Sequence, residues 1–334
     1  MISLPGQSSR KLKLRKQLGI EQKRVSRMDN NNAGLIFHII HGSFVDGYGI
    51  RTTVFLKGCP LRCVWCCNPE GQIGDPEIKL TSSQCDGCGR CVPICPTNAI
   101  QIGLKPGDDK INIDRQLCTG CGKCINLCYT GALDYFGKLM TVDEVFDIVK
   151  KDEQFYRAGV GGVTIGGGEP TFQPLFTRAL LKKCKENYIH TAVDTCGYTS
   201  TSDGLKVLEE GDLLLYDLKG IDPKQHRENT GVSNKLTLDN LSHLASMGKP
   251  IIIRLPIIPG HNDSAENIKS TAEFLSRLRS VERVDLMAYH EYGTIKYKQL
   301  GRKYKLQIQP LSQERLDDIK DTFERHGLNV QLGG

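Results

Sequence analysis

Long apolar runs are missing from this 334-residue sequence, and none approaches the length that a membrane-spanning helix needs. No secretory signal peptide is evident, so disulfide bonds are not expected among the 14 cysteines. The sequence also lacks an obvious Ser/His/Asp set or a pair of catalytic carboxylates. These absences predict a cytoplasmic protein of an anaerobe, with no membrane partner, whose cysteines serve a different chemistry.

The main body of the sequence has little net charge. Residues 1–27 hold eight basic side chains against Glu21 alone, a net charge of +7, so the remainder carries −1 of the total +6. The body therefore lacks the basic surface typical of nucleic-acid binding, and we expect no nucleic-acid partner. We expect a basic, disordered extension over residues 1–33, or a start at Met28 just before the strand-like GLIFHII. Such a tail could also bind an acidic partner or nucleic acid.

Cysteines are abundant: 11 of the 14 form three regularly spaced groups, and a twelfth adjoins the first group. The first group follows the strand-like segment TTVFLKG with the spacing C-x3-C-x2-C, at Cys59, Cys63 and Cys66, and Cys67 follows directly. The other two groups share the spacing C-x2-C-x2-C-x3-C, and their members are Cys85, Cys88, Cys91, Cys95, Cys118, Cys121, Cys124 and Cys128. Structural zinc sites pair two short C-x2-C hooks, so runs of four cysteines favour iron–sulfur clusters over zinc.

The two longer groups have the spacing of bacterial ferredoxins, in which each run holds a 4Fe–4S cluster and lends its fourth thiolate to the other. With that geometry, one cluster is bound by Cys85, Cys88, Cys91 and Cys128. The other is bound by Cys118, Cys121, Cys124 and Cys95. The first group of three cysteines would leave one iron of a third cubane open, so that this cluster could bind a substrate.

The two longer groups also form an internal repeat with a period of 33 residues, and PTNAI after the first is echoed by YTGAL after the second. Such a repeat is typical of a pseudo-twofold ferredoxin module, in which each half holds a loop, a helix and a short strand. We therefore expect a ferredoxin-like α+β domain with two clusters at residues 71–137. It would be inserted in a larger domain formed by residues 34–70 and 138–334.

Strand-like runs alternate with helical patterns in the larger domain. Repeated strand–helix units predict a parallel sheet with helices outside, and six units indicate an α/β fold with a partial (β/α)6 barrel. The expected strands are Thr52–Gly58, Gly162–Gly167, His190–Thr195, Asp212–Lys219, Pro250–Ile258 and Val284–Tyr289. The expected helices are Val142–Arg157, Leu175–Glu186, Asp239–Met247 and Ala265–Leu278. Polar or glycine residues end most of these strands, at the edge where barrel enzymes build their sites.

Several motifs occur in a specific order: DGYGIR at Asp46–Arg51, the three-cysteine group with Trp65 beside its last member, GGGEP, DTCGY, YDLKG, IRLPIIPG and YHEYG. On these motifs, residues 34–334 resemble the radical S-adenosylmethionine enzymes, and among them the glycyl-radical-enzyme activating enzymes. The insert is similar to that of activases for decarboxylases, dehydratases and lyases.

The resemblance implies a reaction and its partners. A flavodoxin or ferredoxin would reduce the 4Fe–4S cluster on Cys59, Cys63 and Cys66, the catalytic cysteines. The electron would cleave S-adenosylmethionine, and the 5′-deoxyadenosyl radical would remove a hydrogen atom from a glycine of a partner glycyl radical enzyme. Three 4Fe–4S clusters are implied in total. Two alternatives remain open: a radical enzyme that acts on a small molecule, and an electron carrier built on the ferredoxin module.

The resemblance also implies which residues bind S-adenosylmethionine. Trp65 lies beside the last cysteine of the triad. Gly167, Gly168 and Glu169 match the segment that meets the amino group, where a backbone without side chains can approach the ligand. A glycine run can equally form a flexible turn.

Polar residues at later strand ends complete the implied pocket. Asp194, Thr195 and Asp217 match a site for a monovalent cation beside the cofactor carboxylate, since hard oxygen ligands suit such an ion. Asp194 or Thr195 could instead cap a helix. Lys219, Arg254 and His290 match pocket-lining positions, although any one of them alone could be an ordinary surface or core residue.

Four residues stand outside the pattern. Tyr48 occupies a position where the motif usually reads Asp-Gly-Pro-Gly, which leaves the local turn open. Adjacent cysteines cannot easily bind the same cubane, so Cys67 is expected to be a spare thiol. Cys184, on a helix, is expected to be a buried apolar residue. Cys196 ends a strand near the site and receives no role.

Overall fold

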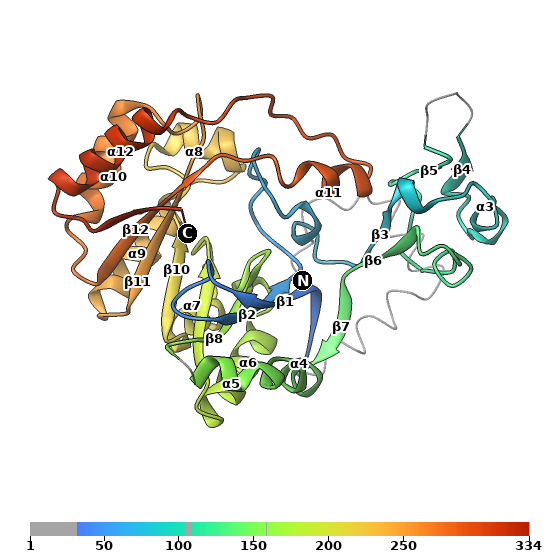
Figure 1. The fold of residues 1–334 in the computed structure, drawn as a ribbon, viewed down its shortest axis with the longest axis horizontal. Coiled ribbons are helices and arrows are strands. Elements are labelled where there is room, and N and C mark those ends of the chain that lie inside the picture. The colour runs from blue at the N-terminus through green and yellow to red at the C-terminus, as the bar shows by residue number, and fades with distance from the viewer. Residues whose placement is uncertain (1–31, 104–108, 158, 334) are drawn as a thin grey trace.

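The computed structural model describes residues 32–103, 109–157 and 159–333. The extension expected at residues 1–33 therefore falls almost entirely outside the described residues. A large α/β unit and a smaller cysteine-rich unit, at the right of Figure 1, are seen. No helix of the described part is both long and apolar enough to cross a membrane.

A nine-stranded sheet forms the centre of the larger unit, with the strand order β13-β12-β11-β10-β9-β8-β2-β1-β7. Neighbouring strands from β2 to β13 are parallel, and β1 and β7 add an antiparallel edge. The strands are β1 (Ala33–Ser43), β2 (Arg51–Leu56), β7 (Lys138–Thr141), β8 (Gly162–Gly167), β9 (His190–Thr195), β10 (Leu213–Asp217), β11 (Ile251–Ile257), β12 (Val281–Ala288) and β13 (Val330–Leu332). All six predicted strands are present. The sheet also contains β1, which includes the strand-like GLIFHII, and it is extended by β7 and β13.

Helices connect the parallel strands, and most of them pack on one face of the sheet (Figure 1). They are α4 (Val142–Val149), α5 (Glu153–Arg157), α6 (Pro174–Glu186), α7 (Ser202–Glu210), α8 (Pro223–Thr230), α9 (Lys235–Ser246), α10 (Ala265–Leu275), α11 (Thr294–Gln299) and α12 (Gln313–Arg325). Side chains from α4, α6, α7, α9, α10 and α12 join strand residues in one apolar core. Cys184 lies in this core with no exposed surface, which confirms its prediction as a buried apolar residue.

One predicted helix is interrupted. The pattern over Val142–Arg157 predicted a single helix, but a 3-10 turn at Lys150–Asp152 separates α4 from α5. The reason is long-range: the Asp152 carboxylate accepts a hydrogen bond from the Thr52 hydroxyl on β2 at 2.5 Å, which holds the turn against the sheet. The start of α4 is as the sequence suggests, because Thr141 and Glu144 form a reciprocal capping box.

The inner face of the sheet is divided into an apolar and a polar half. Side chains alternate between the two faces of a strand, so Leu213, Leu215 and Asp217 share one face of β10. The N-terminal halves of β9, β10 and β11 contribute an apolar cluster of Ala192, Leu213, Leu215 and Ile252, covered by Tyr48. The next inward positions toward the C-terminal ends are Asp194, Asp217 and Arg254. This register therefore puts charged side chains together above an apolar floor.

The smaller unit contains two antiparallel pairs, β3 (Glu77–Leu80) with β6 (Leu133–Phe136) and β4 (Ile100–Ile102) with β5 (Ile111–Ile113). Its other elements are α3 (Cys91–Ile94) and the 3-10 turn Ser82–Gln84, and two further 3-10 turns of the chain are Pro69–Gly71 and Pro170–Phe172. Cysteines and aliphatic side chains, mainly isoleucines, form its separate core. A short strand follows each cysteine run, as the repeat predicted. The helix predicted in the second half is only a series of turns, because the backbone bonds there are mainly of the three-residue kind.

Candidate active site

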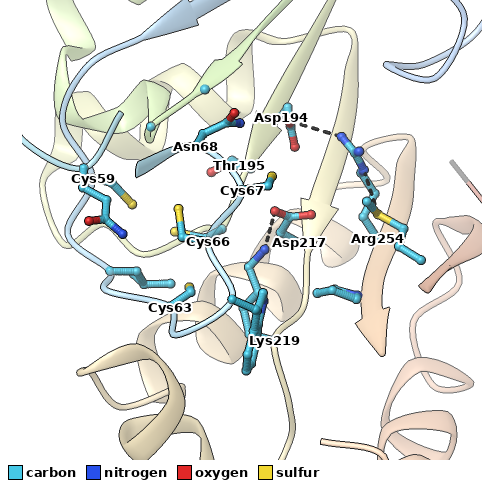
Figure 2. Close-up of a pocket in the computed structure, with 18 of the residues that line it drawn as sticks. Cys59, Cys63, Cys66, Cys67, Asn68, Asp194, Thr195, Asp217, Lys219 and Arg254 are labelled. Carbon is cyan, nitrogen blue, oxygen red and sulfur yellow. Dashed lines mark hydrogen bonds and ion pairs between the residues drawn. The ribbon is translucent and has the colours of Figure 1, made fainter. Parts of the chain in front are cut away.

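The C-terminal ends of the parallel strands and the loop after β2 surround a cavity of about 210 Å³ (Figure 2). Of the residues expected from the sequence, twelve line it: Cys59, Cys63, Trp65, Cys66, Gly167, Gly168, Asp194, Thr195, Asp217, Lys219, Arg254 and His290. These residues are spread over more than 230 positions of the chain, and the parallel sheet brings them to one edge. The cavity is therefore the candidate active site.

The three-cysteine loop is held by backbone hydrogen bonds to the end of α8. The amides of Arg62 and Val64 donate to the carbonyls of Thr230 and Asn229 at the end of α8, at 2.8 and 2.9 Å. Gly58 begins the loop with a φ of 97°, and a Cβ there would lie 2.1 Å from the Phe172 ring. A side chain at this position is thus excluded twice, by conformation and by space. Only glycine at position 58 therefore allows the chain to turn as it does before Cys59.

Two glycines open the cavity beside this loop. A Cβ on Gly168 would lie 2.4 Å from the Gly58 carbonyl oxygen and 2.7 Å from that of Gly71, so three backbone segments meet here. The Gly167 φ of 101° is in the region that favours glycine. Backbone without side chains at the cavity wall lets a ligand approach closely, as expected for Gly167 and Gly168 of the GGGEP motif.

The Glu169 side chain, expected at the cofactor, does not line the cavity. It is fully buried and accepts three hydrogen bonds: from the Thr171 amide at 3.1 Å, the Thr195 hydroxyl at 2.8 Å and the Cys196 amide at 2.8 Å. Its carboxylate therefore joins the turn after β8 to the end of β9. The side chain fixes the walls of the pocket, and only the backbone of this motif is open to the cavity, at Gly167 and Gly168.

The charged side chains that line the cavity at the ends of β9, β10 and β11 form two pairs (Figure 2). The Arg254 guanidinium lies 3.2 Å from the Asp194 carboxylate and 3.7 Å from that of Asp46. The Lys219 ammonium lies 2.5 Å from Asp217. Three carboxylates therefore face two cations. Burial, opposed by Arg254 and reinforced by Asp217 and Asp46, raises the pKa of Asp194 to about 7. A cationic ligand would relieve this excess of negative charge.

The aromatic end of the cavity contains Trp65, Ile258 and Tyr289, which pack together as a buried cluster. The Trp65 ring meets His261 edge-on at a centroid distance of 6.0 Å, and its buried Nε1 has no hydrogen-bond partner in the described structure. His290 stacks on Tyr292 with 4.3 Å between centroids. Burial lowers the pKa of His290, so its imidazole is neutral at neutral pH and can both donate and accept a hydrogen bond.

The cysteine triad has the chemistry of a cluster site. Burial raises the pKa of Cys63 to about 12 and that of Cys66 well above its ordinary value, while a hydrogen bond from Cys196 lowers that of Cys59. Two of the three thiols would thus keep their protons at neutral pH unless a metal displaced them. Within the described residues, no three His, Cys, Asp or Glu side chains close around a single ion. A cubane, whose irons take one thiolate each, fits these separated thiols better.

Twelve other lining residues had no predicted role, among them Asp46, Cys67 and Cys196. Asp46 belongs to the DGYGIR motif, and its carboxylate also accepts hydrogen bonds from Ser43 and Thr53, each at 2.7 Å. Cys196 and Cys67 add two sulfurs to the lining. The motif position of Asp46 was the only available signal, since its contact with Arg254 joins residues more than 200 positions apart.

The smaller, cysteine-rich unit contains two further cavities, and their cysteines come from both halves of the repeat. One is lined by Cys85, Cys88, Cys91 and Cys128. The other is lined by Cys95, Cys118, Cys121 and Cys124. The fourth cysteine of each run thus lies with the other run's first three, which is the grouping expected from the spacing. Four thiols around each small cavity suit a 4Fe–4S cluster.

Comparison with protein families gives two matches. The radical SAM superfamily matches residues 119–275, and a 4Fe-4S dicluster domain matches residues 84–132. The first match begins within the insert and does not reach Cys59, Cys63 or Cys66. The second match covers both cysteine runs of the repeat.

Curated relatives cover nearly the whole chain. The choline trimethylamine-lyase activating enzyme of Oleidesulfovibrio alaskensis is 39% identical over 302 residues, 89% of this chain and 97% of the relative. The trans-4-hydroxy-L-proline dehydratase activating enzyme of Clostridioides difficile is 41% identical, over 90% of this chain and 99% of the relative. The 4-hydroxyphenylacetate decarboxylase activating enzyme of that species (strain CD196) is 37% identical, over 90% and 96%.

A solved structure supports the fold over most of the chain. Streptococcus suis SuiB bound to its precursor peptide SuiA matches 96% of this chain and 54% of the solved chain, with a TM-score of 0.52 and 16% identity. At this identity the likeness concerns the fold alone.

Proposed function

Because this chain belongs to the glycyl-radical-enzyme activating enzymes of the radical SAM superfamily, we propose that it installs a radical on a glycine of a partner glycyl radical enzyme. Relatives at 37–41% identity are named for a lyase, a dehydratase and a decarboxylase. Because the sequence identities to these relatives are so similar, we propose only the class of the partner, a glycyl radical enzyme. The observation that carries it is the single cavity shared by the cysteine triad, the glycine turn and the charged strand ends.

A 4Fe–4S cluster on Cys59, Cys63 and Cys66, when bound, supplies one electron for reductive cleavage of S-adenosylmethionine to methionine and the 5′-deoxyadenosyl radical that abstracts hydrogen from glycine. The chain's own residues bind and orient the reactants. Gly167 and Gly168 offer bare backbone to the amino group, and Trp65 and His290 flank the nucleoside. The buried setting excludes water from the reacting atoms.

The charged wall fits S-adenosylmethionine as a whole. Its sulfonium and ammonium groups are cationic and its carboxylate is anionic. Arg254 and Lys219 can form ion pairs with the carboxylate. The positive charge of these two side chains is partly neutralised by Asp194, 3.2 Å from Arg254, and by Asp217, 2.5 Å from Lys219. We propose in addition that a monovalent cation occupies the space near Asp194, Thr195 and Asp217, where carboxylates outnumber cations.

The architecture proposed for this chemistry is a partial (β/α)6 barrel formed by residues 34–70 and 138–334, with a ferredoxin-like insert at residues 71–137. The insert would hold two 4Fe–4S clusters on the eight cysteines that line its two cavities. Arg115, close to Cys118, donates to the Gln299 carbonyl at 3.0 Å, and Lys296 of the same helix α11 donates to the Cys67 carbonyl at 3.2 Å. This bridge supports a role of the insert in delivering electrons toward the triad, from a flavodoxin or ferredoxin in the cytoplasm.

The test of the activity uses the purified, anaerobically reconstituted chain with S-adenosylmethionine and dithionite. The partner to be tested is a large protein with a glycine loop of the R-V-x-G-[YF] kind near its end, sought first among the products of neighbouring genes. Formation of 5′-deoxyadenosine together with a persistent glycyl radical signal on the partner is expected, and Cys59→Ala should abolish both. Cleavage with no glycyl radical on the partner would instead favour a radical enzyme acting on a small molecule.

The role of the insert is tested by replacing Cys85, Cys88, Cys118 and Cys121 with alanine. Electron delivery predicts slow turnover with a protein donor but near-normal single turnover with a small chemical reductant. Unchanged turnover with the protein donor, accompanied by weaker binding of the glycyl radical enzyme, would identify the insert as a docking domain.

A further inference from the structure

The fourth cysteine of each run has similar polar surroundings. The Ala99 amide donates to Cys95 Sγ at 3.3 Å, and the Leu133 amide donates to Cys128 Sγ at 3.3 Å. A threonine hydroxyl lies near each of these sulfurs, two positions after the cysteine: Thr97 Oγ1 at 3.7 Å from Cys95, and Thr130 Oγ1 at 3.6 Å from Cys128. The 33-residue repeat therefore includes these two threonines.

Cluster chemistry decides the direction of the two hydroxyl contacts. Between a free thiol and a hydroxyl, either group can donate. A cysteine bound to iron is a thiolate and has no proton, so only the threonine can then donate. Thr130 is already orientated for this, because its oxygen accepts from the Ala132 amide at 3.4 Å and leaves its proton for the sulfur.

We propose that Thr97 and Thr130 are positioning residues. Each raises the reduction potential of one of the two insert clusters by donating a hydrogen bond to the fourth cysteine that binds it. The inference rests on the proposed function, in which the insert holds two clusters. Reduction adds negative charge to a cluster, and a hydrogen bond to its sulfur stabilises that charge. Hydrogen bonds to the sulfurs are among the features that set the potentials of such clusters.

The exchange of fourth cysteines gives the proposal a specific consequence. Thr97 belongs to the first half of the repeat, yet its partner Cys95 lies in the cavity of Cys118, Cys121 and Cys124. Thr130 belongs to the second half, yet Cys128 lies in the cavity of the first half. Each threonine should therefore affect the cluster bound mainly by the other half of the sequence.

The two sites have different surroundings, so their clusters can be distinguished. Beside the Cys118 loop, the Tyr135 hydroxyl donates to the Gly120 carbonyl at 3.2 Å. The residue 33 positions earlier is Ile102, which is 44% exposed and near Gly89 of the other loop. A hydroxyl group over one site and an apolar side chain over the other give the two clusters different environments before any threonine is changed.

The experiment compares Thr97→Val and Thr130→Val, which remove the hydroxyl and keep the shape, with Thr97→Ser and Thr130→Ser, which keep the hydroxyl. Each full-length protein is reconstituted anaerobically, its iron is counted, and its clusters are titrated potentiometrically by electron paramagnetic resonance. Signals are assigned with Cys85→Ser and Cys118→Ser. Each valine variant should make the midpoint potential of one insert cluster more negative. For Thr97→Val this is the cluster in the cavity of Cys118, Cys121 and Cys124, and for Thr130→Val it is the cluster in the cavity of Cys85, Cys88 and Cys91. The midpoint potential of the triad cluster should not change. The serine variants should match the wild type.

Unchanged midpoint potentials in both valine variants at full iron content would overturn the proposal. A shift confined to the other insert cluster would also overturn it, as would serine variants whose potentials shift as far as those of the valine variants. If a valine variant binds less iron, the alanine variant at the same position replaces it and the same criteria apply. A wild-type protein whose insert binds no clusters would instead reject the proposed function of the insert.

Discussion

The Lys57 ammonium lies 3.2 Å from the Glu77 carboxylate and has no exposed surface. Lys57 immediately follows β2, two residues before the first cysteine of the triad, and Glu77 begins β3 of the insert. Arg302, after α11, also contacts Glu77, at 2.5 Å. One carboxylate therefore joins the cysteine loop, the insert and the C-terminal segment.

We predict that Glu77→Gln lowers the free energy of unfolding by about 3–5 kcal/mol, the usual cost of leaving a buried charge unpaired. Anaerobic guanidinium unfolding measures this change. The double variant Lys57→Met/Glu77→Gln should recover part of the loss, because it removes the unpaired ammonium as well. If the double variant is no more stable than Glu77→Gln, the pair is not the source of the effect.

Arg254 is predicted to be required for binding of S-adenosylmethionine. Arg254→Met leaves Asp194, Asp46 and Asp217 with Lys219 as the remaining cation of the two pairs, so the carboxylate of the ligand would meet an anionic wall. We expect the dissociation constant to rise at least tenfold, a loss of about 1.4 kcal/mol. Calorimetric titration of the oxidised, cluster-loaded protein measures binding without turnover.

The matched control is Arg283→Met. Arg283 pairs with Asp285 at 2.5 Å on β12 and does not line the cavity, so its loss should leave the affinity unchanged. Equal weakening in both variants would show that the effect is a general loss of positive charge.

Local patterns predicted six of the nine strands of the main sheet, and together with the family resemblance they predicted half of the cavity lining. Strand-like apolar runs that alternate with helical patterns identified six strands, and the parallel arrangement then brings Asp194, Asp217 and Arg254 to one edge. The break between α4 and α5 was not predictable, because it depends on Asp152 contacting Thr52, 100 positions away.

Roles that depend on contacts between distant segments could not be read from the sequence. Glu169 was expected at the cofactor because, with Gly167 and Gly168, it matches the family segment that meets the amino group. Its side chain turns instead to the amide of Cys196, on the next strand connection. Likewise, nothing near Lys57 in the sequence indicates Glu77 and Arg302 as its neighbours. The motifs identified the site, and tertiary contacts decided which of its residues face the cavity.

Cys67 is predicted not to bind the cluster although it lines the cavity. Its carbonyl accepts from Lys296, and a Cβ on Gly293 would lie 2.9 Å from its Cα, so α11 packs directly on its backbone. Cys67→Ser should keep about 12 iron atoms per chain, four for each of three cubanes, and near-normal 5′-deoxyadenosine formation. Cys66→Ser should lose the triad cluster. The reverse pattern in iron content would show that Cys67 is the third ligand.

Tyr48, which departs from the family motif, is predicted to anchor the loop between β1 and β2. Its ring covers the apolar floor of the sheet, and its hydroxyl donates to Glu282 at the start of β12 at 2.6 Å. Tyr48→Phe keeps the ring and loses this bond, so we expect a loss of about 1 kcal/mol in the free energy of unfolding. Tyr48→Ala should lose substantially more, since it also removes the packed ring.

The pH dependence separates the hydrogen bond of Tyr48 from its packing. Burial and the bond to Glu282 raise the pKa of Tyr48 to about 12, above its ordinary value of about 10. The folded state therefore favours the protonated phenol, and the resulting stability is complete below pH 10 and lost as the pH rises toward 12. The difference in stability between the wild type and Tyr48→Phe should shrink over this interval, as followed by urea unfolding. A difference that stays constant from pH 8 to pH 11.5 would mean that the hydroxyl does not stabilise the loop through Glu282.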